Sequence, residues 1–479
     1  MKKLIFISFI LLQVITGYCF TLEWSFQTGD RILSHPVLDE GVVYFGSNDN
    51  NLYALDAENG DLIWNFQVDF NVQSSPVIHD SLIFFESGNS HFALNKYTGE
   101  EIWSYIIDEP YGTEKIDYWD YHHAAPVIVD SIVVFACGDG NLYAYNLHNG
   151  NPFFMYTTLE SAAIRSTPVQ DNYHLYFGDW DGRIYSYNLV LQDTLWCVET
   201  YQTQPYPTFG QVNTKMVVHD SLLIFGARNP TLQVFNKFNG NLVWDYTVAG
   251  GGWISGDALV VNDTLYIGGS DCNKMFAFDV YSGELLWDYT FLFNNFSEPV
   301  IYEDMIIFTT GDAYAFQGTN YGDGYLYALQ RNNGTLVNYE RIGGNLFTTP
   351  IIHDGKIYIG SSDTNFYCVD LDSFINGTGT EEELLDPRSN NLYNYPNPFN
   401  PATTISFYSV NSEENTSITI YNLKGQKVKE LIREIYLCGE HSIVWDGTNA
   451  SGEEVNSGLY FVKLQSGQLE SINKILLLK

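Results

Sequence analysis

The sequence predicts an all-β protein in which an eight-bladed β-propeller is followed by a small immunoglobulin-like β-sandwich. Three observations predict this fold class. One phrase ending in Gly and Trp recurs at a fixed internal spacing. A unit of short strands and tight turns returns about every 40–50 residues, the range of propeller blades. The composition changes near residue 376, after which a second set of short strands begins.

The recurring phrase consists of an apolar strand, a turn that closes on Gly, and a Trp. Its clearest copy occupies residues 54–64, and further copies end at Trp103, Trp244 and Trp287. In all four copies the Trp lies ten positions after the first residue. Self-similarity at a fixed period is the signature of a repeat protein and is interpreted before any single residue.

Around each phrase the same strands return. A Pro-apolar-apolar strand leads into a tight polar turn, a second strand ends near Gly, and a third strand precedes the Trp strand. Short β-branched and aromatic runs separated by turn residues are typical of strands and hairpins. No helical period is sustained within residues 20–375. The eight units are anchored at Pro36, Pro76, Pro126, Pro168, Lys215, Gly256, Pro299 and Pro350.

The two ends of the repeat predict that the array closes into a ring. The last unit lacks a Trp strand, and a Trp strand around Trp24 precedes the first unit. We expect this strand to pair with the strand around Cys368, because closure removes two exposed sheet edges. The propeller is therefore predicted to span residues 20–375.

The recurring Trp residues are predicted to dock each blade against its neighbour, because a large ring with one polar group suits such a seam. In the third and seventh units Phe154 and Asn338 replace the Trp, and the turn of the fourth unit lacks Gly. The residues assigned to blade docking are Trp24, Trp64, Trp103, Trp196, Trp244 and Trp287.

These residues resemble the tryptophan-docking repeat of pyrroloquinoline-quinone-type propellers. That family includes quinone-dependent alcohol dehydrogenases and the propeller lipoprotein of the outer-membrane protein assembly machine. The resemblance implies, for the dehydrogenases, a disulfide between adjacent cysteines and an acidic calcium site at the cofactor. Here the cysteines are at 19, 137, 197, 272, 368 and 438, with no adjacent pair. The resemblance therefore favours the non-catalytic branch, with no cofactor and no pyrroloquinoline quinone expected.

The first 19 residues have the features of a secretory signal peptide. Lys2 and Lys3 precede an apolar core of about a dozen residues, which is too short to span a bilayer comfortably. Small residues at Gly17 and Cys19 indicate cleavage after Cys19.

The C-terminal part is predicted to be a separate domain. Residues 376–391 form a polar, turn-rich linker, and residues 392–479 contain about seven short strands that read as a β-sandwich. The Tyr-Pro-Asn-Pro-Phe-Asn-Pro entry, Trp-Asp-Gly and Gly-Leu-Tyr-Phe motifs of this segment resemble the type A C-terminal sorting domain of the type IX secretion system. The resemblance implies passage across the outer membrane, the type IX secretion machinery as partner, and a final location at the cell surface or outside the cell.

The charge excludes two classes of partner. The formal net charge is −35, and an acidic surface repels nucleic acid and anionic lipid headgroups.

The cysteines left after cleavage, odd in number and widely spaced, predict neither a disulfide framework nor a metal-finger pattern. We expect a monomer.

The irregular loops on one face of the propeller are the predicted ligand-binding region, because function tends to lie on variable loops held by a rigid scaffold. Aromatic faces can stack on sugar rings or grip peptide side chains, and carboxylates add polar specificity. The candidate ligand-binding residues are Trp119, Trp180, Trp253, Tyr321, Asp117, Asp120, His122 and Arg183.

Two patterns raise the question of a metal. His122 and His123 lie near acidic residues, but neighbours on a strand point to opposite sides, so no metal site is assigned. A recurring hairpin Asp, four residues before a Tyr, leaves calcium open, although tight hairpins need the same residues. Its copies are Asp49, Asp139, Asp181 and Asp363.

Two classes of function stay open. The favoured one is a non-catalytic binding or scaffold propeller that recognises glycan or protein, with no catalytic residue assigned. The alternative is a secreted propeller enzyme, either a quinone-dependent oxidoreductase or a polysaccharide lyase or hydrolase that uses Asp117, Asp120 or His122.

Overall fold

The computed structural model describes the propeller and the C-terminal domain with gaps. The described residues are 20–88, 90–107, 123–200, 211–249, 251–313, 322–377, 392–395, 401–409, 415–422, 424–435, 439–466 and 469–477. The expected cleavage site at Cys19 and most of the expected linker lie outside them.

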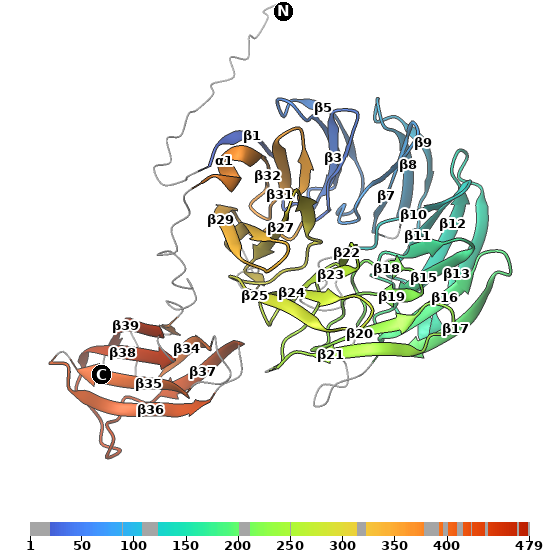
Figure 1. Cartoon of the computed structure of the whole chain (residues 1–479). Helices are drawn as coiled ribbons and strands as arrows, with labels where there is room; N and C mark the ends of the chain where they lie inside the picture. The colour runs from blue at the N-terminus through green and yellow to red at the C-terminus, as the bar shows by residue number, and fades with distance from the viewer. Residues whose placement is uncertain are drawn as a thin grey trace, which may run out of the picture.

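Within these residues the first 370 positions form eight four-stranded antiparallel sheets arranged as the blades of a ring (Figure 1). The predicted eight-bladed propeller is thereby confirmed. Inner strands of neighbouring blades contact one another around the centre. From inner to outer strand, blades 1 to 4 are β2 (Val37–Asp39), β3 (Val42–Ser47), β4 (Asn51–Asp56) and β5 (Leu62–Gln67); β6 (Val77–His79), β7 (Leu82–Ser87), β8 (Ser90–Asn95) and β9 (Glu101–Tyr105); β10 (Val127–Val129), β11 (Ile132–Ala136), β12 (Asn141–Asn146) and β13 (Pro152–Thr157); β14 (Val169–Asp171), β15 (His174–Gly178), β16 (Arg183–Asn188) and β17 (Asp193–Glu199).

The second half of the ring repeats this order. Blades 5 to 8 are β18 (Val217–His219), β19 (Leu222–Ile224), β20 (Thr231–Asn236) and β21 (Leu242–Thr247); β22 (Leu259–Val261), β23 (Thr264–Gly268), β24 (Lys274–Asp279) and β25 (Leu285–Thr290); β26 (Val300–Tyr302), β27 (Met305–Gly311), β28 (Gly324–Gln330) and β29 (Leu336–Gly343); β30 (Ile351–His353), β31 (Lys356–Gly360), β32 (Asn365–Asp370) and β1 (Leu22–Gln27). A 3₁₀ turn covers Leu159–Ser161 in the connection between blades 3 and 4, and the helix α1 covers Leu371–Ile375.

Blade 8 contains both ends of the propeller. The N-terminal strand β1 pairs antiparallel with β32, and Trp24 lies opposite Cys368 in the register. In Figure 1 the blue β1 lies beside the orange β32. The expected closure of the ring is therefore confirmed.

Six Trp side chains of the described residues lie in seams between adjacent blades. In each seam the indole Nε1–H of one blade donates a hydrogen bond to a backbone carbonyl in the turn before the outer strand of the next blade. The pairs are Trp24 with Ala57 (3.3 Å), Trp64 with Lys96 (3.0 Å), Trp103 with Leu147 (2.8 Å), Trp196 with Lys237 (3.1 Å), Trp244 with Val280 (2.9 Å) and Trp287 with Arg331 (3.0 Å).

The Gly of the phrase belongs to the same seams. Gly99 has a φ of +70°, and a Cβ atom there would lie 2.7 Å from Cδ2 of Trp64 in the preceding blade. This close approach and the left-handed backbone both favour Gly. The same relation joins Gly60 to Trp24, Gly150 to Trp103, Gly240 to Trp196, Gly283 to Trp244 and Gly334 to Trp287.

The two seams without Trp use other contacts. Phe154 of blade 3 packs on Tyr187 of blade 4, with ring centroids 5.4 Å apart, and the facing turn has Gln192 at φ +52° instead of Gly. Asn338 of blade 7 donates from Nδ2 to the carbonyl of Phe374 in α1, at 2.5 Å. The Trp and the Gly are therefore lost at seams where the neighbouring turn has also changed.

The C-terminal domain contains a three-stranded and a four-stranded sheet around Trp445, which is fully buried in its core. The strand orders are β33-β34-β37 and β36-β35-β38-β39. The bounds are β33 (Tyr393–Tyr395), β34 (Thr403–Ser409), β35 (Asn415–Asn422), β36 (Lys427–Ile435), β37 (Gly439–Trp445), β38 (Gly458–Ser466) and β39 (Leu469–Leu477). Over the described part of the chain, no helix has the length and apolar character needed to cross a membrane.

Candidate functional site

One position of the repeat faces the central channel in every blade. It is the residue two places before the inner strand, and its eight copies are called the channel ring here. All eight line a cavity of about 340 Å³. The channel ring consists of His35, Ser75, Ala125, Thr167, Lys215, Asp257, Glu298 and Thr349.

The channel ring is tied together by hydrogen bonds from one blade to the next. In five of the eight steps around the ring, a backbone N–H donates to the side chain of the following ring residue. The bonds run from His35 to Ser75 (3.0 Å), Ala125 to Thr167 (2.9 Å), Lys215 to Asp257 (2.8 Å), Glu298 to Thr349 (3.0 Å) and Thr349 to His35 (2.7 Å). The ring therefore both lines the cavity and joins the blades.

Three neighbouring blades place charged groups in the channel ring. The Lys215 ammonium lies 3.0 Å from the Glu298 carboxylate, and the carboxylate of Asp257 accepts the backbone N–H of Lys215. Burial raises the pKa of Asp257 and of Glu298, and the positive charge of Lys215 partly offsets this effect. Burial alone would lower the pKa of Lys215, but the charge and hydrogen bond of Glu298 together with the charge of Asp257 outweigh burial, so the pKa is raised.

His35 is the neutral imidazole of the ring. Its Nδ1 accepts the backbone N–H of Thr349, and burial followed by the charge of Lys215 lowers its pKa from 6.5 to about 4. The proton therefore sits on Nε2 at neutral pH, because Nδ1 is used as an acceptor.

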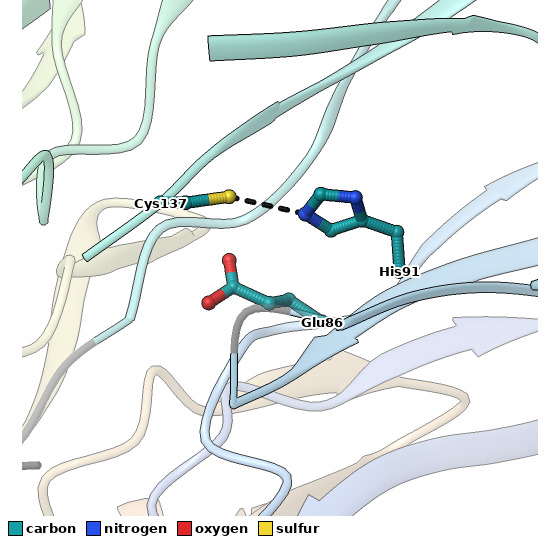
Figure 2. A group of neighbouring side chains, drawn as sticks. All are labelled: Glu86, His91 and Cys137. Carbon is teal, nitrogen blue, oxygen red and sulfur yellow. Dashed lines mark hydrogen bonds between the residues drawn. The ribbon is translucent and has the colours of Figure 1, made fainter. Parts of the chain in front are cut away.

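A second polar cluster lies in the seam between blades 2 and 3 (Figure 2). Nε2 of His91 is 3.0 Å from Sγ of Cys137, and Nδ1 of His91 is 3.0 Å from the hydroxyl of Tyr145. Burial lowers the pKa of His91 to about 3 and raises that of the Cys137 thiol. Burial also raises the pKa of Glu86, an effect that His123 and Arg165 partly offset.

Two of the predicted ligand-binding residues converge on one cation. Arg228, in the hairpin between β19 and β20, is 2% exposed. Its guanidinium lies 4.4 Å from the ring centroid of Trp180 and 5.7 Å from that of Trp253. The three residues come from blade 4, blade 5 and the connection to blade 6, so these loops form one aromatic and cationic platform. The backbone N–H of Trp180 donates to the Ala163 carbonyl at 2.8 Å, which ties this loop to the segment that leads into the channel-lining residues Arg165 and Thr167.

Arg183 does not join this platform. Its guanidinium lies 3.4 Å from the Asp181 carboxylate, 3.6 Å from that of Glu160 and 3.9 Å from that of Asp179. Arg183 also donates to the Leu159 carbonyl at 3.3 Å. The side chain therefore closes its own hairpin against the 3₁₀ turn.

The hairpin Asp residues close turns. Tyr53, Tyr143 and Tyr367 donate to the carboxylates of Asp49, Asp139 and Asp363 at 2.6–2.7 Å, and each Asp also accepts the N–H two residues on. In blade 4 the assignment of this role to Asp181 was wrong. Tyr185 donates instead to Asp179, at 2.7 Å, because Asp179 is the buried member and accepts both N–H groups of the turn.

Five of the predicted ligand-binding residues lie outside the described residues. They are Asp117, Trp119, Asp120, His122 and Tyr321. Their assignment stays a prediction from the sequence.

The sequence reasoning missed Arg228, the charged residues of the channel ring and the cluster around His91. For some of these residues the sequence did contain a signal, namely a departure from the repeat. Lys215 and Asp257 stand in the two units that lack the leading Pro, and Glu86 stands where most units have Gly. Departures from the repeat therefore mark these positions, whereas Arg228 lies in a turn without any repeated pattern.

The cysteines of this chain do not reproduce the disulfide that the family resemblance implies at a quinone cofactor, and the expectation of no cofactor stays a prediction from the sequence. Of the described cysteines, Cys137, Cys197, Cys272 and Cys368 lie on different blades, and none of the four forms a disulfide. No adjacent pair exists in the sequence to form the disulfide that the resemblance implies.

Comparison with solved structures supports the fold. The chain is similar to a europium-containing methanol dehydrogenase, with 13% identity, a TM-score of 0.60, and coverage of 74% of this chain and 93% of that one. It is also similar to the quinohemoprotein alcohol dehydrogenase from Comamonas testosteroni, with 12% identity, a TM-score of 0.58, and coverage of 74% and 76%. The computationally designed Ika8 protein has 13% identity, a TM-score of 0.57, and coverage of 71% and 96%. At these identities the likeness concerns the fold alone.

Comparison with family models adds the family. The model described as outer membrane protein assembly factor BamB matches residues 21–198 and 199–374, and the model described as secretion system C-terminal sorting domain matches residues 394–478. A search of curated proteins gave no match. The sorting domain identifies the chain as cargo of the type IX secretion system, located at the cell surface or secreted. Because the first match covers most of its length, the chain belongs to the BamB assembly factor family of propellers.

Proposed function

We propose that this exported propeller is a non-catalytic glycan-binding protein that holds a sugar chain at the mouth of its central channel. The observation that carries the proposal is the platform of Trp180, Arg228 and Trp253. An indole stacked on a buried guanidinium is fixed in orientation before a ligand arrives. A fixed aromatic face loses little entropy on binding and suits the apolar face of a sugar ring.

The chemistry of the channel ring favours a neutral, hydroxyl-rich ligand. Lys215 and Glu298 compensate each other's charge, the Asp257 carboxylate accepts the backbone N–H of Lys215, and Ser75, Thr167 and Thr349 add hydroxyl groups. The cavity of about 340 Å³ is at the small end of ligand pockets, which span about 300–1,000 Å³. This size fits the end of a sugar chain better than a folded protein surface.

The test is a glycan array probed with the mature chain, followed by calorimetric titration of the best ligand. We expect Trp180→Ala and Trp253→Ala to weaken binding several-fold each, because stacking contributes about 0.5–1.5 kcal/mol beyond burial. Phe238→Ala is the matched control, because Phe238 is 66% exposed in a docking turn away from this platform. Equal binding by all three variants, or binding to peptides alone, would contradict the proposal.

A second measurement separates binding from catalysis. The mature chain is incubated with pyrroloquinoline quinone and Ca²⁺ and followed by dye reduction with alcohol substrates. The array polysaccharides are assayed in parallel for newly formed chain ends. We expect no turnover in either assay, and saturable turnover would replace this proposal with an enzymatic function.

A further inference from the structure

Blade 2 carries two polar residues where the repeat elsewhere has small or apolar ones. Glu86 in β7 occupies the position of Gly46, Gly178, Gly226, Gly268 and Gly360 in other blades. His91 in β8 occupies the position of Leu52, Leu142, Ile184, Leu232, Met275, Leu326 and Phe366. The other blades fold without these polar groups, so their presence in blade 2 needs a different reason.

The strand register places the two residues side by side. Glu86 and His91 are direct partners in the β7–β8 ladder, and cross-strand partners project to the same face of a sheet. Blade 3 supplies Cys137 opposite that face, immediately after β11 (Figure 2). The carboxylate, imidazole and thiol donor atoms lie within 4.8 Å of one another, and all three residues are buried.

The Glu86 carboxylate is the feature that calls for a ligand. The residue is 1% exposed, and among the residues that the structure describes neither carboxylate oxygen has a hydrogen-bond partner. The imidazole Nδ1 of His123 lies 3.6 Å from Oε1, beyond hydrogen-bond distance. Burying a carboxylate without hydrogen bonds is strongly unfavourable, whereas coordination of a cation satisfies it.

We propose that Glu86, His91 and Cys137 bind one Zn²⁺ ion in the seam between blades 2 and 3. Thiolate, imidazole and carboxylate are the ligand types that Zn²⁺ takes, and three protein ligands leave a fourth position for water. At the usual bond lengths such ligand atoms are roughly 3–4 Å apart, so the present separations need only small shifts.

The surroundings of His91 orient it for this role. Nδ1 of His91 is hydrogen-bonded to the Tyr145 hydroxyl, so Nε2 is the nitrogen left to face Cys137 and the ion. A partner of this kind on the second nitrogen is the usual support of a metal-binding His. Zn²⁺ binding releases the thiol proton of Cys137 to solvent, because the thiolate is the ligand. The ion ties blade 2 to blade 3 beside His123, which lines the channel cavity.

The test uses the mature chain, purified without added metal under a phosphine reductant and stripped with a chelator. Zn²⁺ is titrated against a chromophoric chelator, and Co²⁺ is titrated as a spectroscopic substitute. We expect one tight Zn²⁺ ion per chain, a rise in Tm on Zn²⁺ addition, and a thiolate-to-cobalt charge-transfer band in the near ultraviolet.

Three variants locate the ion. Cys137→Ser is expected to remove the charge-transfer band and to weaken Zn²⁺ binding at least tenfold. Glu86→Gln, which keeps the side-chain shape, should weaken binding at least tenfold while the apo protein keeps its Tm or gains stability. Cys272→Ser is the matched control, because Cys272 is also a buried thiol outside any disulfide but belongs to blade 6. This variant should bind Zn²⁺ as the parent does.

The proposal is overturned if the stripped parent chain binds no Zn²⁺ in competition with the chelator. It is also overturned if Cys137→Ser keeps the parent affinity and cobalt spectrum. Glycan binding is measured on the same samples and does not enter either criterion, so the two proposals can fail separately.

Discussion

The seams between blades and the central channel are built from the same repeat but use it in opposite ways. In the seams the same pair recurs, a Trp of one blade and a Gly of the next, as in Trp64 with Gly99. In the channel ring one structural position holds seven different residue types, from Ala125 to Lys215. Most seams make the same packing contact, so their residues repeat. The eight channel positions together line one cavity, so each can hold a different residue.

This difference shows where to search for function in a repeat protein. The regular positions determine how blades pack, and the departures from them mark the places where a single blade differs in chemistry. Lys215, Asp257 and Glu298 come from consecutive blades and meet in the channel. Glu86 and His91 both depart from the pattern in blade 2, and they are partners across one hairpin.

The largest expected effect is the loss of a seam Trp. Trp64→Ala removes a ring that is 9% exposed, together with its hydrogen bond to Lys96, and leaves a cavity against Gly99. We expect it to lower the free energy of unfolding by about 3–5 kcal/mol, measured by denaturant titration. Trp180→Ala, outside the seams, should cost about 1 kcal/mol or less, the value of one cation–π contact. Equal losses in the two variants would remove the distinction between seam and channel.

The next effect concerns acid stability of the channel. The pKa of His35 is about 4 in the folded chain and about 6.5 when unfolded, so the unfolded state binds the proton more tightly. The stability contributed by neutral His35 is complete above about pH 6.5 and is lost as the pH falls to about 4. Because the His35 side chain is only partly buried, we expect the free energy of unfolding to fall by about 2–3 kcal/mol over this pH range.

His35→Asn is the variant that isolates this effect. The Asn side-chain oxygen can still accept the Thr349 N–H, but the side chain does not titrate in this range. Unfolding is measured at pH 7 and pH 4 for both proteins. The variant should lose about 2–3 kcal/mol less than the parent between the two pH values. If the parent and the variant lose the same free energy of unfolding between pH 7 and pH 4, His35 is not protected from protonation in the channel.

The fold was largely predictable from the sequence because its determinants repeat. The closing contact of Trp24 with the strand of Cys368 followed from one strand missing at the end and one spare at the start. The replacements at Phe154 and Asn338 were visible as decay of the phrase. The reason for these two replacements was not visible in the sequence, because it depends on contacts with the next blade.

The candidate site was predictable only in part. Trp180 and Trp253 were found as Trp residues outside the repeated phrase, but Arg228, which holds them together, carries no sequence signal. Cys137 lies near Glu86 only through the packing of two blades, a long-range contact that spacing along the chain does not report. Residues that interact across a seam therefore need the structure, whereas residues that repeat do not.

A third prediction separates two reasons for Gly in the seam. Gly99→Ala combines a left-handed backbone with a Cβ placed 2.7 Å from Trp64, whose ring is held by its own hydrogen bond. Gly355→Ala has a similar φ of +73° but no atom within 4 Å. Thermal unfolding should show a loss of about 1 kcal/mol for Gly355→Ala and at least about 2 kcal/mol for Gly99→Ala. If the two losses are equal, backbone conformation alone explains the recurring Gly.

The smallest expected effect tests how much the channel ring contributes to stability. Ser75→Ala removes the hydroxyl that accepts the N–H of His35 and reproduces the residue found in the next blade, Ala125. We expect a loss of about 0.5–1.5 kcal/mol by denaturant titration, the net value of one hydrogen bond, because water in the channel can replace the lost acceptor. Ser104→Ala, whose hydroxyl bonds an exposed Glu101 on an outer strand, is the control and should be nearly neutral. A loss for Ser75→Ala as large as that of Trp64→Ala would mean that the ring holds the blades together as the seams do. Its residues would then be constrained by packing, and their variety could not be attributed to a ligand.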